Sequence, residues 1–165
     1  MNKQDLIDSL RLEPHLEGGY FRRTYESSLG TDVAVIGERA LMSSIYYLLT
    51  DDSPIGYFHR NRSDIVHYWH SGHALTYYLI NPEGEFSRVK LGPNINDGDR
   101  LQLIVPGGYW KATVLTQGHY GLLSEAVAPG FDYDDMTLAT ASQMQQDFPE
   151  LWNNPALQLP KYCKL

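Results

Sequence analysis

The chain has 165 residues, of which 42% are hydrophobic and 20% charged, and its formal net charge at pH 7 is −7. These values exclude a disordered or fibrous chain, and the length suits a single domain with its own core. The surplus of acidic residues argues against a nucleic-acid partner, which requires a basic face, and no apolar run is long enough to span a membrane. We therefore expect neither nucleic acid nor a membrane as a partner.

The N-terminal residues are the first predicted element. Residues 2–12 predict a short helix, because Asn2 can cap its start and Leu6, Ile7 and Leu10 share one stripe.

Most of the chain predicts short strands. Apolar and aromatic runs alternate with turns rich in Gly, Pro, Asn and Asp, at a spacing of roughly ten residues. The runs predict strands over 20–25, 40–50, 56–61, 64–70, 74–80, 86–91, 101–105, 110–116 and 120–128. This spacing is typical of a sandwich or barrel.

The C-terminal residues predict a small helical segment and a tail. Ser142 and Gln145 resemble a capping box for one or two helical turns, and three prolines interrupt the rest of the chain. We expect residues 1–165 to form one domain, with a core barrel over about 12–138 and a partly irregular tail over 139–165. The single cysteine, Cys163, cannot form an internal disulfide, and no secretory signal is visible, so we predict a cytoplasmic protein.

One two-part pattern stands out. His59 lies on a short strand, an aromatic strand comes next and ends at Gly72, and a Pro-Gly turn begins at Pro106. In a small barrel, alternate residues point inward and such Gly and Pro-Gly positions form the corners. This order resembles the two motifs of the cupin superfamily.

The chain is similar in particular to the Cupin_5 family, the YML-type cupins of unknown function. The matching segments are LEPHLEGGYFRRTYES, ERALMSSIYYLL, FHRNRSD, LIVPGGYW and VAPGFDYDDM. The resemblance implies an all-β double-stranded β-helix, the cupin jelly-roll barrel, with a short N-terminal helix and a small helical C-terminal segment. It also implies a homodimer, but no particular reaction.

Many cupins bind a transition metal through His-x-His, a nearby Glu and a His after the second motif. The corresponding positions here hold His59, Asn61, Ile65 or Val66, and Lys111. Isoleucine cannot bind a metal, and a lysine brings positive charge to the site. We therefore expect no metal and no other cofactor.

A relocated metal site is the alternative. Strand alternation places Ile65 and His67 on the same face, so an inward Ile65 implies an inward His67. His59, His67 and Glu125 would then form a facial triad. The other interpretation of His67 is a packed, hydrogen-bonded ring, since the family pattern usually has Trp at this position.

His59 is the first catalytic candidate, because an imidazole titrates near neutral pH as acid–base chemistry requires. A structural histidine that bonds a backbone carbonyl is the competing interpretation. Tyr46 and Tyr47 alternate on the 40–50 strand, so one of the two rings faces the interior. By analogy with sugar-nucleotide epimerases of similar fold, we assign Tyr46 as the second catalytic candidate.

The ligand-binding candidates are Glu17, Arg22, His67 and Trp110. Glu17 precedes two glycines and either reaches the pocket mouth or accepts backbone N–H groups at a corner. Arg22 and Arg23 face opposite ways, so at most one enters the barrel, as an ion pair with Glu17 or as an anion clamp. Trp110 either stacks on a sugar or base ring or belongs to the core.

These residues lead to three functional hypotheses. The first is a metal-independent barrel that binds a small polar, sugar- or nucleotide-like ligand and isomerises or epimerises it with His59 as the acid–base group. The second is a ligand-binding or sensing barrel without turnover. The third is a metal-dependent cupin enzyme with the relocated histidine site.

Overall fold

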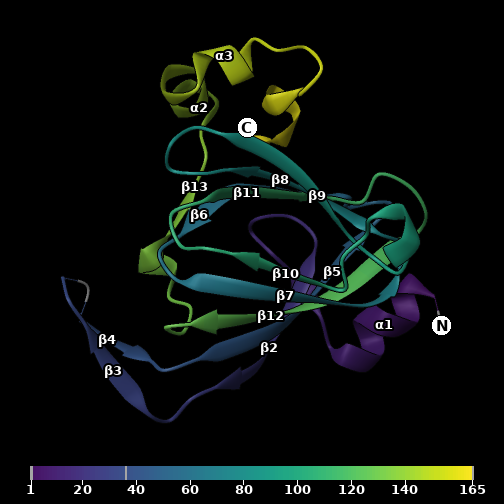
Figure 1. Cartoon of the computed structure of the whole chain (residues 1–165). Helices are drawn as coiled ribbons and strands as arrows, with labels where there is room; N and C mark the ends of the chain where they lie inside the picture. Colours follow the sequence, from purple (N-terminus) through teal and green to yellow (C-terminus); the bar gives the residue numbers. More distant parts are fainter. Residues whose placement is uncertain (1, 36, 165) are drawn as a thin grey trace.

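The computed structural model describes residues 2–35 and 37–164, which form a six-stranded, a five-stranded and a two-stranded sheet. The two larger sheets face each other, and helices cover the outer face of each (Figure 1). This architecture confirms the predicted all-β jelly-roll barrel with a short N-terminal helix and a helical C-terminal segment.

The first sheet has the antiparallel strand order β1-β2-β5-β12-β7-β10. Its strands are β1 (Glu13–Pro14), β2 (Tyr20–Glu26), β5 (Ser43–Thr50), β7 (Asp64–Gly72), β10 (Gln102–Val105) and β12 (Tyr120–Ala128). Because β12 lies between β5 and β7, the chain crosses to the other sheet and back before this sheet is complete.

The second sheet has the antiparallel order β13-β6-β11-β8-β9. Its strands are β6 (Ile55–Asn61), β8 (Leu75–Ile80), β9 (Phe86–Leu91), β11 (Trp110–Val114) and β13 (Met136–Leu138). In this sheet β6 and β11 are neighbours, and Lys111 stands opposite His59. The two cupin-like motifs therefore meet side by side.

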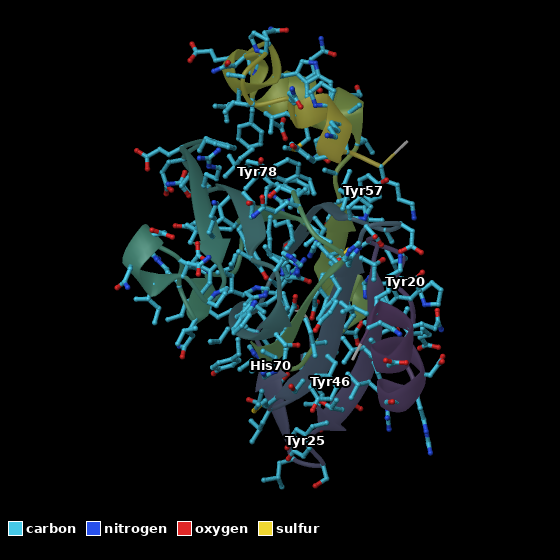
Figure 2. The ribbon with its side chains drawn as sticks, turned by 90° about the vertical axis from the view of Figure 1, so that its right-hand side faces the viewer. Tyr20, Tyr25, Tyr46, Tyr57, His70 and Tyr78 are labelled. Atoms are coloured by element: carbon cyan, nitrogen blue, oxygen red, sulfur yellow. The ribbon has the colours of Figure 1, made fainter. Side chains whose placement is uncertain are left out.

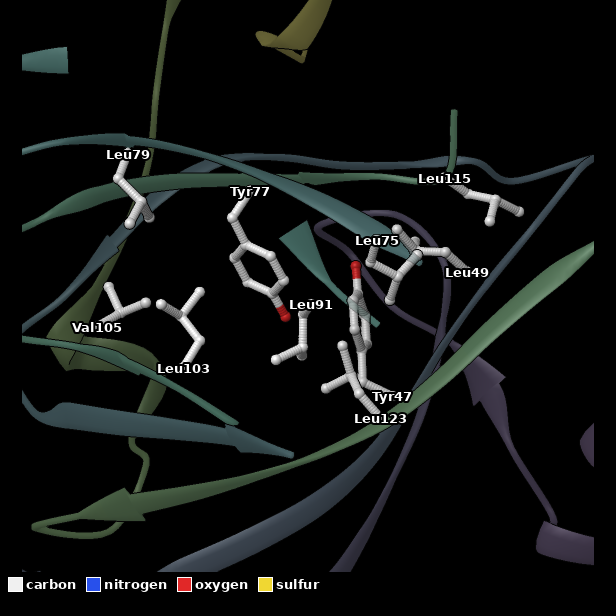
Figure 3. Close-up of a cluster of buried hydrophobic side chains, with 10 residues drawn as sticks. All are labelled: Tyr47, Leu49, Leu75, Tyr77, Leu79, Leu91, Leu103, Val105, Leu115 and Leu123. Carbon is white, nitrogen blue, oxygen red and sulfur yellow. The ribbon is translucent and has the colours of Figure 1, made fainter. Parts of the chain in front are cut away.

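Apolar side chains from both sheets fill one part of the interior (Figure 3). Tyr47 enters from the first sheet and Tyr77 from the second, and both are buried. The other core residues of this cluster are Leu49, Leu75, Leu79, Leu91, Leu103, Val105, Leu115 and Leu123. Since this part is packed with side chains, space for a ligand has to lie elsewhere in the barrel.

Helix α1 (Lys3–Leu10) covers the outer face of the first sheet (Figure 1). Asn2 caps it as predicted, since its side chain accepts from the backbone N–H of Asp5 at 2.9 Å. Leu6 packs with Leu48 of β5 and so buries the apolar stripe of the helix.

The C-terminal segment covers the outer face of the second sheet (Figure 1). It contains helix α2 (Ala141–Asp147), helix α3 (Pro149–Trp152) and the 3₁₀ turn η3 (Leu159–Tyr162); two further 3₁₀ turns are η1 (Ile95–Asp97) and η2 (Tyr133–Asp135). Met144, Leu159 and Cys163 are buried here against Phe58 and Trp110. The predicted irregular tail is thus a cover for the sheet.

The predicted start of this helical segment was wrong by two residues. Thr140, not Ser142, is the N-cap, and its hydroxyl accepts from the backbone N–H of Gln143. The sequence places two residues that can cap a helix close together, and the earlier one is the cap.

A two-stranded hairpin projects from the barrel (Figure 1). Its strands are β3 (Gly30–Val33) and β4 (Gly37–Ala40), which lie almost entirely between the predicted strands over 20–25 and 40–50 and were not predicted. This hairpin is largely polar and exposed, so it lacks the apolar alternation that identified the other strands.

Among the residues that the structure describes, no helix combines the length and the apolar character needed to cross a bilayer.

Candidate functional site

A small pocket lies between the two sheets and adjoins the apolar cluster, since Phe21 and Ile45 line the pocket and also pack against that cluster. Its volume is about 30 Å³. It is lined by His15, Glu17, Phe21, Arg23, Ile45, His59, Asn61, Ile65, Glu125, Val127 and Phe131. A larger cleft of about 620 Å³ lies beside Arg60 and Trp110, but the interior histidines and glutamates do not line it. The convergence of buried titratable groups therefore selects the small pocket as the candidate site.

The turn between β1 and β2 carries Glu17 to the pocket. Gly18 has a φ of 96°, and a Cβ there would collide with the carbonyl oxygen of Ile55. The backbone N–H of Tyr57 donates to the carbonyl of Glu17 at 2.7 Å, and the Tyr47 hydroxyl donates to that of Gly18 at 2.8 Å. These bonds fix the turn against β6, two residues before the catalytic candidate on that strand.

Glu17 and His59 are in direct contact. Glu17 Oε2 lies 3.2 Å from His59 Nε2, and both side chains are at least nine-tenths buried. His59 Nδ1 donates to the carbonyl oxygen of Tyr57 at 2.7 Å, so this nitrogen carries a proton. Two lone pairs at 3.2 Å would repel each other, so one further proton lies between Glu17 and His59.

Burial places that proton on the carboxyl group. Removal from water raises the pKa of Glu17 from 4.5 to about 8, although the positive charge of Lys111 acts in the opposite direction. Burial, aided by Lys111, lowers the pKa of His59 from 6.5 to about 3. At neutral pH the contact is therefore a carboxylic acid that donates to a neutral imidazole.

His15 forms the far side of this group. Its Nδ1 accepts from the backbone N–H of Glu17 at 3.1 Å and lies 3.6 Å from Glu17 Oε2. Burial lowers the pKa of His15 to about 4. A neutral ring is consistent with the hydrogen bond, because a protonated Nδ1 has no lone pair with which to accept.

A second group of polar side chains adjoins the pocket. His67 Nδ1 lies 3.2 Å from Glu125 Oε1, and Lys111 Nζ lies 3.7 Å from the same oxygen. Lys111 Nζ also donates to His67 Nε2 at 3.3 Å, and the Tyr77 hydroxyl lies 3.1 Å from His67 Nδ1. His67 therefore donates through Nδ1, accepts through Nε2 and is neutral.

The protonation of Glu125 is opposite to that of Glu17. Burial alone would raise the pKa of Glu125, but Lys111 and His67 hold it well below its usual range. Burial and the Lys111 charge lower the pKa of His67. The pocket thus contains one neutral carboxyl group and one ionised carboxylate, each set by its neighbours.

The donor set does not fit the metal site that many cupins have. Both ring nitrogens of His67 are occupied by hydrogen bonds, and Lys111 supplies the positive charge beside Glu125. Within residues 2–35 and 37–164, no three His, Cys, Asp or Glu side chains are arranged to hold a metal ion. The alternative triad of His59, His67 and Glu125 therefore receives no support from this geometry.

The fold brings four of the predicted residues together: His59 and Glu17 line the pocket with Glu125, and His67 lies directly behind Glu125. The inward direction of His67 follows strand alternation, as expected. The fold places the other three, Tyr46, Arg22 and Trp110, away from the pocket.

The placement of Tyr46 corrects the expectation for the 40–50 strand. Its ring lies on the outer face of the first sheet, with the apolar residues under α1 and 6.0 Å from the ring of His70 (Figure 2). Tyr47 is the inward ring, but its hydroxyl is bonded to Gly18, and burial holds its pKa well above the usual value. Tyr46 therefore does not face His59 across the barrel.

The placement of Arg22 is a second correction. Its guanidinium donates to the carbonyl of Leu10 at 3.1 Å, on the α1 side of the first sheet. Arg23 is the arginine that reaches the pocket mouth, where it pairs with the exposed Glu26. Strand alternation indicated that only one of the two arginines faces inward, but not which one.

Trp110 is a core residue. Its side chain is 2% exposed and packs under the C-terminal segment, and the Arg60 guanidinium covers its ring at 4.7 Å. A ring this buried offers no face for stacking, so its assignment as a ligand-binding residue is corrected.

Three residues of the site were missed as functional: His15, Asn61 and Lys111. The sequence analysis considered Asn61 and Lys111 only because they stand at the positions of cupin metal ligands. A polar residue that points into a barrel is itself an indication of a functional role. His15 lies in the best N-terminal match to the family, but no other feature of the sequence indicated that it has a functional role.

The comparisons with known proteins agree on the family. The Cupin_5 family model, "Cupin superfamily (DUF985)", matches residues 4–139. The uncharacterized protein YML079W of Saccharomyces cerevisiae is 38% identical over 148 residues, which cover 81% of this chain and 73% of the yeast protein.

Solved structures show the same fold. A hypothetical protein from Leishmania major has a TM-score of 0.91 at 29% identity and covers all of both chains. Protein SO0799 from Shewanella oneidensis has a TM-score of 0.89 at 34% identity, over 99% of this chain and 98% of its own. A mutant oxalate decarboxylase from Bacillus subtilis has a TM-score of 0.54 at 13% identity, over 92% of this chain and 38% of its own, and is similar in fold alone.

Proposed function

The chain belongs to the Cupin_5 family of the cupin superfamily, and from the site inside its barrel we propose that it catalyses a metal-independent proton transfer of the isomerase or epimerase type on a small polar molecule. The single observation that carries this proposal is the buried contact of Glu17 with His59, in which an acid and a base share one proton.

The pair can supply both partners of an enolisation. When the carbonyl oxygen of a substrate enters, Glu17 Oε2 donates its proton to that oxygen, which frees the lone pair of His59 Nε2. His59 then takes the proton from the neighbouring carbon, and the carbonyl becomes an enol. After this step Glu17 is a carboxylate and His59 is an imidazolium. When the protons return to the substrate at another carbon, or on the other face of the same carbon, the isomerisation is complete.

The pKa of Glu17 supports this role. A catalytic acid works best when its pKa lies near the ambient pH, and that of Glu17 is raised by burial to about 8. A carboxyl with an ordinary pKa would be ionised at pH 7 and would have no proton to give.

Exchange in heavy water tests the proposal. Glycolaldehyde and dihydroxyacetone, the smallest α-hydroxy carbonyl compounds, are incubated with the protein in D₂O, and loss of the C–H proton signals is followed by NMR. We expect the protein to accelerate exchange, and Glu17→Gln or His59→Gln to reduce the acceleration about 100-fold or more. Glu13→Gln, the same change at an exposed position of β1, is the matched control.

The second candidate function is binding without turnover. The size of the pocket favours it, because about 30 Å³ admits only one small group of a ligand. Chemical-shift changes of the His59 ring without any C–H exchange would support the binding function and exclude the enzymatic one. Equal exchange by the wild type and both variants would remove the pair from any mechanism.

A further inference from the structure

Asn61 presents an unpartnered acceptor in the barrel. The residue is 8% exposed and lines the pocket with His59 and Glu125. Among the described residues, no hydrogen-bond partner reaches its Oδ1 atom. A buried carbonyl oxygen without a donor costs about 1–3 kcal/mol, so this atom indicates a missing hydrogen-bond donor at the site.

The available space limits that donor to a small group. A cavity needs about 10–15 Å³ to hold one water molecule. The pocket, at about 30 Å³, therefore favours a small group of a ligand over a large one. A hydroxyl group on a single carbon is such a small group.

The charges around the pocket are balanced in pairs. The Lys111 ammonium offsets the Glu125 carboxylate at 3.7 Å. Glu17 and His59 share one proton, so their contact is neutral overall wherever that proton lies.

The remaining polar groups add no net charge. His15 accepts a backbone hydrogen bond through Nδ1, and His67 accepts from an ammonium through Nε2, so both rings are neutral. Arg23, at the mouth, is paired with Glu26. An ion that enters the pocket therefore meets no unmatched charge, and its loss of hydration is not repaid.

We propose that the pocket selects an uncharged hydroxyl group, which donates to Asn61 Oδ1, and that it rejects carboxylates and ammonium groups of similar size. This inference rests on the proposed function, since it names the substrate class of the same site: neutral hydroxylated compounds.

Three matched fragments test the selectivity. Methanol and methylammonium have two non-hydrogen atoms each, formate has three, and the three compounds differ in charge. Each is titrated into the ¹⁵N-labelled protein while the Asn61 side-chain amide and the His59 ring are followed by NMR. We expect methanol to shift these signals at a concentration at least tenfold lower than either ion. Tighter binding of either ion, or no shift with any of the three, overturns the inference.

A charge change at Asn61 provides the second test. Asn61→Asp is expected to reverse the preference, so that methylammonium binds at least tenfold more tightly than methanol, because the pocket gains a negative charge without a partner. Asn153→Asp, the same change at an exposed site beyond α3, should keep the preference for methanol. An unchanged preference in a folded Asn61→Asp protein contradicts the role of Asn61.

The two proposals fail in different ways. Methanol selectivity with no C–H exchange leaves the hydroxyl pocket intact and removes the enzymatic activity. If C–H exchange depends on Glu17 but formate binds more tightly than methanol, the proposed activity stands and the inference about Asn61 is wrong.

Discussion

Glu17 and Glu125 line the same pocket, yet neighbouring groups give them opposite protonation states. Glu17 contacts two histidines and stays neutral, whereas Glu125 contacts Lys111 and His67 and is ionised. Residue identity alone does not distinguish the two. The difference comes from the position of a single ammonium group on β11.

Glu17 gives the protein a pH-dependent stability. Above pH 4.5 the unfolded chain releases this proton, but the folded protein retains it up to a pKa of about 8, so stability falls as the pH rises. Below pH 6.5, His59 opposes this trend, because its pKa is lowered to about 3 and the unfolded chain binds the extra proton. The net loss therefore appears between pH 6.5 and 8, with a slope of up to about 1.4 kcal/mol per pH unit.

Urea denaturation of the wild type and Glu17→Gln at several pH values measures this slope. The glutamine variant should lose the decline between pH 6.5 and 8, while Glu13→Gln should keep it. A wild-type stability that is flat or rises over this range shows that Glu17 is ionised in the folded protein.

Lys111 is expected to be essential to the stability of the interior. Lys111→Met removes the partner of a buried carboxylate and should lower the free energy of unfolding by about 3–5 kcal/mol at pH 7. The double variant Lys111→Met/Glu125→Gln removes both charges and should recover most of that loss. Urea denaturation measures both effects, with Lys90→Met, at an exposed position of β9, as the control. Strict additivity of the two substitutions would contradict a direct interaction.

At the scale of elements, the C-terminal segment covers the outer face of the second sheet and shields it from solvent. β6 and β11 present Phe58 and Trp110 outward, and α2 with η3 buries both rings. The same two strands present His59 and Lys111 inward. Packing of this segment therefore supports the strands that position the site.

Met144 is the central residue of that cover, since its side chain is fully buried in the α2 contact. Met144→Ala is expected to destabilise the protein by about 2–5 kcal/mol through the cavity that it leaves. Gln145→Ala, at the next and exposed position of the same helix, should change stability by less than about 0.5 kcal/mol. Thermal and urea denaturation compare the two, and equal effects would show that α2 does not pack firmly on the sheet.

For the whole molecule, a group of exposed apolar residues lies in and beside the β3–β4 hairpin, between the end of β2 and the start of β5. These residues are Tyr25, Leu29, Val35, Leu41 and Met42. The hairpin extends from the barrel (Figure 1), and these side chains are 38% to 101% exposed. Apolar surface of this kind is typical of an interface, and the family resemblance implied a homodimer. We propose that a second copy of the chain covers it.

Light scattering after size exclusion tests this proposal. The wild type should have about twice the 18.8 kDa mass of the chain, and the double variant Leu29→Ser/Met42→Ser should shift to the mass of the monomer. Ile95→Ser, another exposed apolar position, should remain dimeric. A monomeric wild type at high protein concentration would exclude the proposed interface.

The sequence by itself determined the family, the barrel and most of its strands. Alternation, turn residues and motif spacing are local properties, and they placed β6 to β12 within a residue or two and turned His67 inward. The polar, exposed β3–β4 hairpin escaped the same rules because it lacks that alternation.

Only the tertiary structure decided what the site is. It showed that Glu17, rather than Tyr46, meets His59, because a turn far away in the chain is fixed against β6. It also decided which carboxyl keeps its proton and that Asn61 lacks a donor. Desolvation and charge pairing depend on groups that come together only in the folded barrel, so no local pattern in the sequence encodes them.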